Sequence, residues 1–337
     1  MITEIRRWLL RHQDWLCQVL DISCVGVISD VQLRRLLSEV NHELLYKFHS
    51  QYFGWGLSLL SEDSWISVDG KELRGTIDGV MGQKRGLALV HFHVHHFQLS
   101  LACGFYFGHK DSETTVVRNL LKNNDLTGRC FTFDALHCQE KTLKMVAEQN
   151  GIFIVQVKEN QPHLLDVIND HIQIGKPLEV IKTYDKAHGR IEERVGNIYQ
   201  VSKECFNDKW AEIGFDKLIV LQRTFTKIKT QKVSKETSFY LSNSVKQTNS
   251  QLFSAIRGHW SIEAIHWIRD KTFGEDAIRC ANEGRSKNLA CLLSVALNLI
   301  KQSSVLNIKA LHEDLVADTN KTIPFFSRIS VPISNSV

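Results

Sequence analysis

The sequence predicts an α/β fold in which a mixed β-sheet is flanked by helices, with a short helical region first and a β-rich section before the last helices. Before residue 60 and after residue 251, apolar residues recur at three- and four-residue steps, as in amphipathic helices. Between these limits, short stretches alternate apolar and polar residues, as strands do. A helical pattern joins two of these strands, which predicts a crossover connection.

These changes of pattern divide the chain into five parts. We expect a helical N-terminal region over 1–60, a first part of the core over 61–175, a β-rich section over 176–250, helices that complete the core over 251–310, and a tail over 311–337. No proline-rich linker marks a boundary, because the chain has only four prolines.

Individual elements have their own signals. The stretch "DVQLRRLLSEVNHELLYKF" is typical of helices, with Ser29 or Asp30 as an N-cap. Strands are predicted over 65–69, in "CFTFDALH" (130–137), and in "LALVHFHVHH", "QLSLACGFYF" and "IFIVQV". The helix "EKTLKMVAEQN" should end before Gly151, since glycine favours a helix C-terminus.

Composition and charge limit the class of protein. The 337 residues are 43% hydrophobic and 23% charged, as in soluble globular proteins, and the net charge of +4 permits a nucleic-acid partner without requiring one. No apolar run is long enough to span a bilayer, and the first residues do not form a signal peptide. The eight scattered cysteines form no CxxC pair, so we expect reduced thiols in a cytoplasmic protein.

Two aspartates are the first candidate site residues. Asp69 and Asp134 each follow an apolar strand, in "ISVDGK" and "FTFDALH". Carboxylates at the carboxyl ends of strands stand where α/β proteins bind ligands. The alternative for each is a turn-forming or helix-capping residue.

Glu263 is the third candidate. Read as a helix, "RGHWSIEAIHW" places Glu263 in line with Trp260 and Trp267, on a face that we expect to be packed. A buried carboxylate needs a partner. That partner is either an arginine or a divalent cation shared with the two aspartates, most plausibly Mg²⁺. Two such ions would activate a water or a 3′-hydroxyl against a phosphodiester.

Polar residues near these carboxylates are candidate DNA contacts. Lys71 and Arg74 follow Asp69 and could hold a phosphate, or be solvated loop charges. Lys158, Asn160 and Gln161 follow the "IFIVQV" strand and could contact the DNA backbone, or form an ordinary polar turn.

Two aromatic patterns have competing interpretations. Trp260 and Trp267 could stack on an unpaired base, although tryptophans at helical spacing are more often in the core. The histidine-rich "HFHVHH" contains no cysteine or carboxylate that would complete a standard zinc site, so we expect a half-exposed strand there.

Seven motifs, in order over roughly residues 25–305, carry a resemblance to a known family: "VDGKELRGT", "FTFDALHCQ", "VQVKENQP", "DKAHGRIEER", "FYLSN", "IRGHWSIEAIHWIRDKTFGED" and "ALNLIK". The chain resembles bacterial insertion-sequence transposases of the DDE type. Within them, it is most similar to the subgroup that contains the H-repeat-associated proteins of Rhs elements.

The resemblance implies a fold, an activity and a site. It implies an RNase H-like core with a β-rich insertion before the last catalytic helix. It implies that Asp69, Asp134 and Glu263 hold Mg²⁺, with Mn²⁺ as a substitute. The activity would be cleavage of double-stranded DNA at the terminal inverted repeats of the protein's own element, followed by strand transfer to target DNA. A homodimer on DNA and a cytoplasmic, nucleoid-associated location are expected.

The resemblance also adds DNA-binding candidates in two of its motifs. These are His188, Arg190, Arg257, His259 and Trp260.

Two other functions are compatible with the residues. A catalytically silent transposase remnant or DNA-binding regulator fits the N-terminal region, which is shorter than is usual in the family. A two-carboxylate hydrolase such as a glycosidase would use Asp69 and Asp134 as acid and base, without metal. The Tyr-Arg-Glu-Lys signature of better-known relatives is absent, since Ile256, His259 and Asp270 occupy its other positions.

Overall fold

A computed structural model describes residues 2–23, 25–57, 60–61, 64–76, 86–107, 110–187, 189–303, 305, 307–322 and 324–325. The chain forms two compact units. The helical unit comprises Met1–Trp55, Glu72–Leu89 and His266–Val337, and the sheet unit comprises Gly56–Lys71 and Val90–Ile265.

The helical unit is built around its longest helix, α11, which packs against α3 and α4. Asn288 of α11 donates hydrogen bonds to the carbonyls of Leu37 and Val40, over 3.0 and 2.8 Å. Ser29 caps α3 in a capping box with Gln32, which confirms one of the two predicted N-caps. The helices are α1 (Ile2–Arg11), α2 (Gln13–Val19), α3 (Asp30–Glu39), α4 (His42–Tyr52), α11 (Glu283–Gln302) and α12 (Ile308–Ala317).

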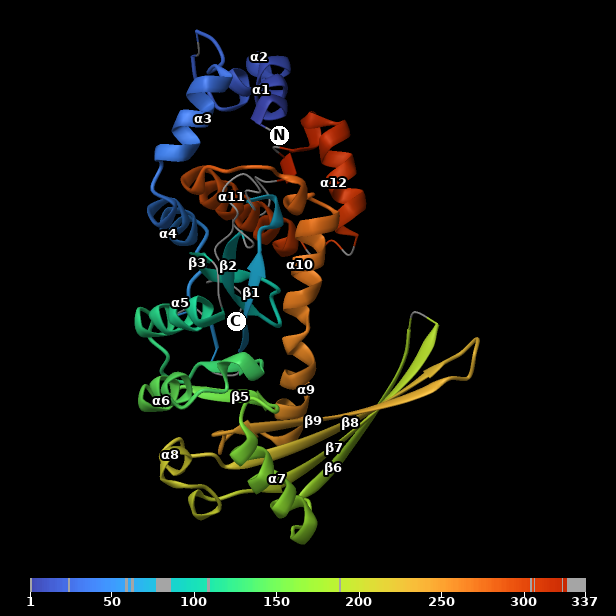
Figure 1. Cartoon of the computed structure of the whole chain (residues 1–337). Helices are drawn as coiled ribbons and strands as arrows, with labels where there is room; N and C mark the ends of the chain where they lie inside the picture. Colours follow the sequence, from blue (N-terminus) through green and yellow to red (C-terminus); the bar gives the residue numbers. More distant parts are fainter. Residues whose placement is uncertain are drawn as a thin grey trace. The chain divides into compact units, whose positions relative to one another are not determined.

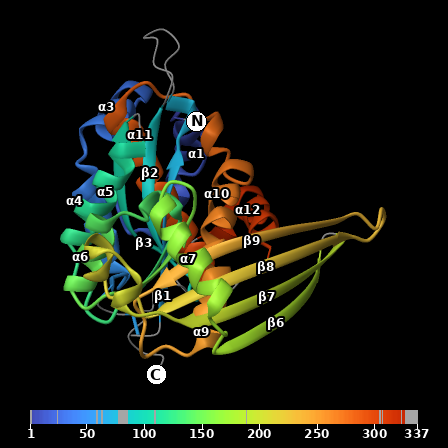
Figure 2. The same ribbon diagram turned by 60° about the horizontal axis from the view of Figure 1, so that its bottom comes forward.

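The sheet unit holds most of a nine-stranded mixed sheet, in the order β3-β2-β1-β4-β5-β9-β8-β7-β6. Strands β1, β4 and β5 are parallel, while β5, β9, β8, β7 and β6 pair antiparallel (Figure 2). The strands are β1 (Trp65–Glu72), β2 (Leu87–Val94), β3 (Ser100–Phe107), β4 (Cys130–Phe133), β5 (Ile152–Val157), β6 (Glu179–Ala187), β7 (Arg190–Gln200), β8 (Lys217–Lys227) and β9 (Val233–Ser242). The mixed α/β class is as predicted, and the sheet is compatible with an RNase H-like fold.

Helices flank this sheet (Figure 1). Helix α5 packs against β3 and α6, and α9 packs against β4, β5 and β6. The helices are α5 (Lys110–Lys122), α6 (Glu140–Glu148), α7 (Pro162–Ile174), α8 (Asp208–Ala211) and α9 (Asn249–His259), and α10 (Ser261–Lys271) has residues in both units. The sequence did not predict α5, because its "TTVV" run is β-branched and a poor helix former; packing overrides that propensity.

Three further expectations concern single features. Strand β1 extends to Glu72, so Asp69 lies inside the strand and not at its end. Six of the described cysteines are free, but Cys17 is disulfide-bonded, so the expectation of eight reduced thiols is wrong. Within the described ranges, no helix is both long and apolar enough to cross a membrane.

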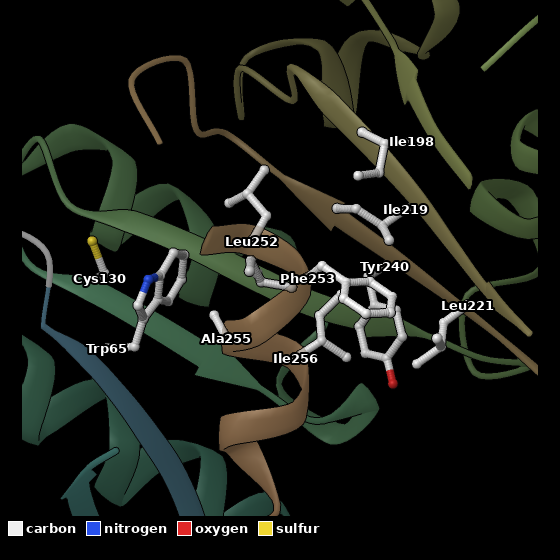
Figure 3. Close-up of a cluster of buried hydrophobic side chains, with 11 residues drawn as sticks. Trp65, Cys130, Ile198, Ile219, Leu221, Tyr240, Leu252, Phe253, Ala255 and Ile256 are labelled. Atoms are coloured by element: carbon white, nitrogen blue, oxygen red, sulfur yellow. The ribbon is translucent and has the colours of Figure 1, made fainter. Parts of the chain in front are cut away.

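A buried cluster fixes α9 on one face of the sheet (Figure 3). Leu252, Phe253 and Ile256 of α9 pack against apolar side chains from β1, β4, β5, β7, β8 and β9. Trp65 and Cys130, which are partners in the β1–β4 register, belong to this cluster. Because side chains alternate along a strand, Asp69 in β1 points to the same face as Trp65. The face covered by α9 is therefore the face that carries the candidate site.

The contact between Gly196 and Phe253 generates a prediction. A Cβ at position 196 would lie 2.5 Å from Phe253 Cε2, inside the packed ring. Gly196→Ala should therefore lower the free energy of urea unfolding by about 1–3 kcal/mol, as overpacking does. In a Phe253→Leu background the same substitution should cost less. An equal cost in both backgrounds would contradict this explanation.

Candidate active site

The two predicted aspartates lie on adjacent strands. Strands β1 and β4 are parallel and pair Val68 with Phe133, so Asp69 and Asp134 each follow one member of the same pair. The N–H groups of Leu136 and His137 donate to Asp134 Oδ1, over 3.0 and 3.4 Å. Asp134 thus caps the short helix η3 (Ala135–His137) and still has 40% of its side chain exposed. The capping interpretation is confirmed for Asp134, and the exposed part of its carboxylate is compatible with the functional one.

Asp69 is electrostatically strained. The pKa of its carboxyl is raised from 3.8 to about 7, first by burial and then by the neighbouring Asp134 and Glu113 carboxylates, in that order of importance. Glu113 comes from α5 and is buried. Residue-level sequence reasoning missed it, since a lone glutamate in an unpredicted helix gives no signal. After Asp134, Glu113 is therefore the second carboxylate that raises the pKa of Asp69.

The loop after β5 braces the turn that carries Asp134. Asn160 Nδ2 donates to the Ala135 carbonyl and Gln161 Nε2 donates to the Cys138 carbonyl, both over 2.7 Å. Both amides were predicted to contact DNA, but here they bind backbone on either side of η3. Their position after a strand correctly placed them beside the Asp134 turn. Their side chains, however, bind backbone carbonyls of this turn.

Four polar side chains on the same face, Ser67, His95, Thr132 and His259, form a network that we call the polar ladder. Thr132 Oγ1 lies 2.9 Å from His259 Nδ1, and His95 Nε2 lies 2.7 Å from Ser67 Oγ. Ser67 Oγ also donates to the His259 carbonyl over 3.2 Å. Burial lowers the pKa of His95 to about 3 and that of His259 to about 4, so both rings are neutral at physiological pH. The ladder fixes the end of α9 to β1 and β4.

The predicted packing around Glu263 is wrong. Glu263 is exposed, as are Trp260 (43%) and Trp267 (60%). The buried stripe of α10 instead contains Ile262 and Ile265, about one residue away around the helix. Burial raises the pKa of the Glu263 carboxyl and Arg223 lowers it, with neither aspartate among the causes. The structure thus brings Asp69 and Asp134 together and places Glu263 beside Arg223.

Glu263 lines a groove of about 460 Å³ between α9 and the antiparallel strands. Arg223 Cζ lies 5.1 Å from the Trp260 ring centroid and 5.5 Å from that of Phe225, and Arg190 Cζ lies 5.2 Å from Phe225. Guanidinium groups over aromatic faces are typical of cation–π contacts. The groove therefore combines positive charge with exposed aromatic surface.

The remaining predicted residues have separate locations. Lys71 is buried in β1, and Lys158 is exposed after β5. Arg74 lies in the helical unit, 3.8 Å from the Asp276 carboxylate. Arg257 forms an ion pair with Asp185 over 2.6 Å. His188 lies outside the described residues.

The acidic pair fits a divalent cation. Within the described ranges, no group of three or more His, Cys, Asp or Glu side chains is arranged to hold a metal ion. Mg²⁺ typically uses one or two carboxylates and takes its other oxygens from water and substrate phosphates. A cation at Asp69 and Asp134 would offset the burial and the neighbouring carboxylates that raise the Asp69 pKa.

Known proteins match this chain over most of its length. The family described as "Transposase DDE domain" matches residues 61–299. The chain belongs to the DDE transposase family. It is 27% identical over 270 residues to the "H repeat-associated putative transposase YhhI" of Escherichia coli K12, covering 77% of this chain and 70% of that one. For the "putative transposase YncI" of E. coli O157:H7, the identity is 26% over 293 residues, covering 82% and 71%.

A shorter match supports the subgroup. The "H repeat-associated putative transposase YbfD" of E. coli K12 is 28% identical over 172 residues, covering 48% of this chain and 65% of that one. This chain is thus a DDE transposase of the Rhs-associated subgroup, as the motifs indicated. The solved structure of Streptomyces venezuelae DesVI covers 39% of this chain and 48% of its own, with 9% identity and a TM-score of 0.19, too low to indicate a shared fold.

The raised pKa of Asp69 predicts how stability depends on pH. The folded Asp69 carboxyl keeps its proton to about pH 7, while the unfolded one loses it near 3.8. The contribution of this carboxyl to folding stability is therefore full below pH 3.8 and is lost as the pH rises through 7. Without metal, Asp69→Asn should therefore gain stability relative to the wild type between pH 5.5 and pH 8 in urea unfolding. A difference that does not change with pH would contradict the assignment.

Proposed function

We propose that this transposase cleaves phosphodiester bonds at the ends of its own mobile element and joins the free 3′-hydroxyls to target DNA in a metal-dependent reaction. The residues proposed to hold the metal are Asp69, Asp134 and Glu263. The observation that carries the proposal is the parallel register of β1 and β4, which sets two carboxylates side by side beyond one residue pair. The proposed fold is an RNase H-like core with a β-rich insertion.

Glu263 is supported as the third carboxylate by its place in the sequence, four residues after His259. His259 Nδ1 lies 2.9 Å from Thr132 Oγ1, and Thr132 precedes Asp134 by two residues in β4. Glu263 follows His259 by four residues, which is about one helical turn. Since α9 ends at His259 and α10 begins at Ser261, Glu263 lies in the first turn of the helix that follows this contact with β4.

Each group of residues has a defined part in this reaction. Bound divalent ions would activate the attacking water or 3′-hydroxyl and stabilise the leaving oxygen. Asp69 and Asp134 supply negative charge from a rigid sheet. The amides of Asn160 and Gln161 hold the Asp134 turn in place. The groove beside Glu263 orients the DNA strand through Arg190, Arg223 and Trp260, and Lys158 and Arg257 are further proposed contacts. Lys71 is not among them, because it is buried in β1.

Cleavage of a supercoiled plasmid carrying both element ends tests the proposal. Wild-type protein should nick the ends with Mg²⁺ or Mn²⁺ and not in EDTA. Asp69→Asn, Asp134→Asn and Glu263→Gln should each reduce the rate by at least 100-fold, as expected when a transition-state contact of about 3 kcal/mol is lost. Glu148→Gln is the control, because it removes an exposed carboxylate of α6.

Two outcomes separate the alternatives. Folded wild-type protein that binds the ends but never cuts them would favour a silent remnant or DNA-binding regulator. Cleavage of a glycoside in EDTA, lost with Asp69→Asn, would favour a two-carboxylate hydrolase. A transposition reaction must also hold two DNA ends together, so a homodimer on DNA is proposed, in a cytoplasmic and nucleoid-associated setting.

Two variants should distinguish the contribution of charge from that of base stacking to DNA binding in the groove. Arg190→Ala should weaken duplex binding at all sequences and reduce the slope of log K against log salt by about 1. Trp260→Ala should weaken binding to an unpaired strand by about 1–3 kcal/mol without changing that slope. The measurement is fluorescence anisotropy over a salt series, with Lys141→Ala as a control that removes an exposed charge outside the groove. Equal slopes for Arg190→Ala and the wild type would exclude a phosphate contact there.

A further inference from the structure

Glu113 is a buried carboxylate beside the acidic pair that the DDE triad does not include. Its helix, α5, brings it to the end of β1, where it raises the pKa of the Asp69 carboxyl. Tyr106 of β3 donates a hydrogen bond to Glu113 Oε2 over 2.7 Å. Burying a third negative charge beside two others costs free energy, so its position needs an explanation.

Gly70 makes room for this carboxylate. A Cβ at position 70 would lie 2.7 Å from the Glu113 carboxyl carbon and 2.8–2.9 Å from both of its oxygens. Since side chains alternate along a strand, Gly70 faces away from α9, on the opposite side of β1 from Asp69. The glycine after the first aspartate therefore lets Glu113 approach the strand from behind the site.

His137 connects Glu113 to Asp134. Its ring is fully buried, with Nε2 lying 3.3 Å from Glu113 Oε1 and 4.0 Å from Asp134 Oδ1. Neither ring nitrogen has a hydrogen-bond partner in the described part of the chain, so the ring meets both carboxylates through close contact and charge. The backbone N–H groups of Leu136 and His137 also donate to Asp134 Oδ1. These contacts converge on one oxygen, so Oδ2 is the oxygen available to a ligand.

We propose that Glu113 and His137 are positioning residues of the acidic pair. Glu113, held by Tyr106 and admitted by Gly70, places its carboxylate 3.3 Å from the His137 ring, and the ring packs within 4.0 Å of Asp134 Oδ1, behind the turn that carries Asp134. Glu113 also adds negative charge behind Asp69, which raises affinity for a divalent cation at the pair. The inference deepens the proposed function, because it concerns the cation that this function requires.

The first experiment measures Mn²⁺ binding to the full chain without DNA, from the electron paramagnetic resonance signal of free Mn²⁺. Glu113→Gln should weaken binding at least 10-fold, in the range found when groups that orient metal ligands are removed. Gly70→Ala should do the same without removing a charge, because its methyl group displaces the Glu113 carboxylate. Glu148→Gln, an exposed change of the same chemistry, should bind as the wild type does.

The second readout is steady-state cleavage of the element ends at saturating metal. Positioning through Asp134 predicts a lower kcat with little change in KM for DNA. In a Glu113→Gln background, Gly70→Ala should have little further effect on either readout, since the carboxylate it displaces is already gone. Independent, additive losses would overturn the proposal, as would Mn²⁺ affinity within twofold of the wild type in folded Glu113→Gln.

A purely structural role gives a different pattern. It predicts a lower melting temperature with unchanged Mn²⁺ affinity, and loss of folded protein in both variants would likewise assign Glu113 to stability and overturn the proposal. If the proposed function is wrong, the experiments give another result. In that case, wild-type protein binds Mn²⁺ more tightly than Glu113→Gln but never cuts DNA.

Discussion

The parallel pairing of β1 with β4 is the constraint on which the rest of the site depends. One register, through Val68 and Phe133, decides that two aspartates distant in the sequence stand next to each other. A shift of one residue would turn one aspartate to the opposite face of the sheet. The backbone pairing therefore sets the proximity of Asp134, which is, after burial, the largest cause of the raised Asp69 pKa.

The surrounding structure keeps this strained pair in place from both faces. On one face, α9 is held by an apolar cluster and by the ladder of Ser67, Thr132 and the two neutral histidines (Figure 3). On the other, α5 contributes Glu113 through the space that Gly70 leaves open. The loop after β5 braces the turn through two amides. The site is thus supported by neutral hydrogen bonds and packing, while its carboxylates lie within β1 and just after β4.

Much of this could be predicted from the sequence, for reasons that differ between residues. Asp69 and Asp134 each come after an apolar run, which is a weak signal for one residue and a better one for two on neighbouring strands, although β1 continues past Asp69. Asn160 and Gln161 were identified by the same signal, although a strand end does not say whether an amide faces DNA or backbone. Glu113 was missed because its helix is rich in β-branched residues and forms only on packing. The exposed face of Trp260 and Trp267 was misjudged, because helical spacing says which residues share a face and not which face is buried.

The continuity of the sheet has a mechanical consequence. Strands β7 and β8, which line the arginine-rich groove, are joined to β4 by an unbroken series of backbone hydrogen bonds through β9 and β5 (Figure 2). A sheet resists shear along its ladders far better than it resists twisting. The groove and the turn that carries Asp134 therefore share one continuous support, because the strands beside both belong to the same hydrogen-bonded sheet.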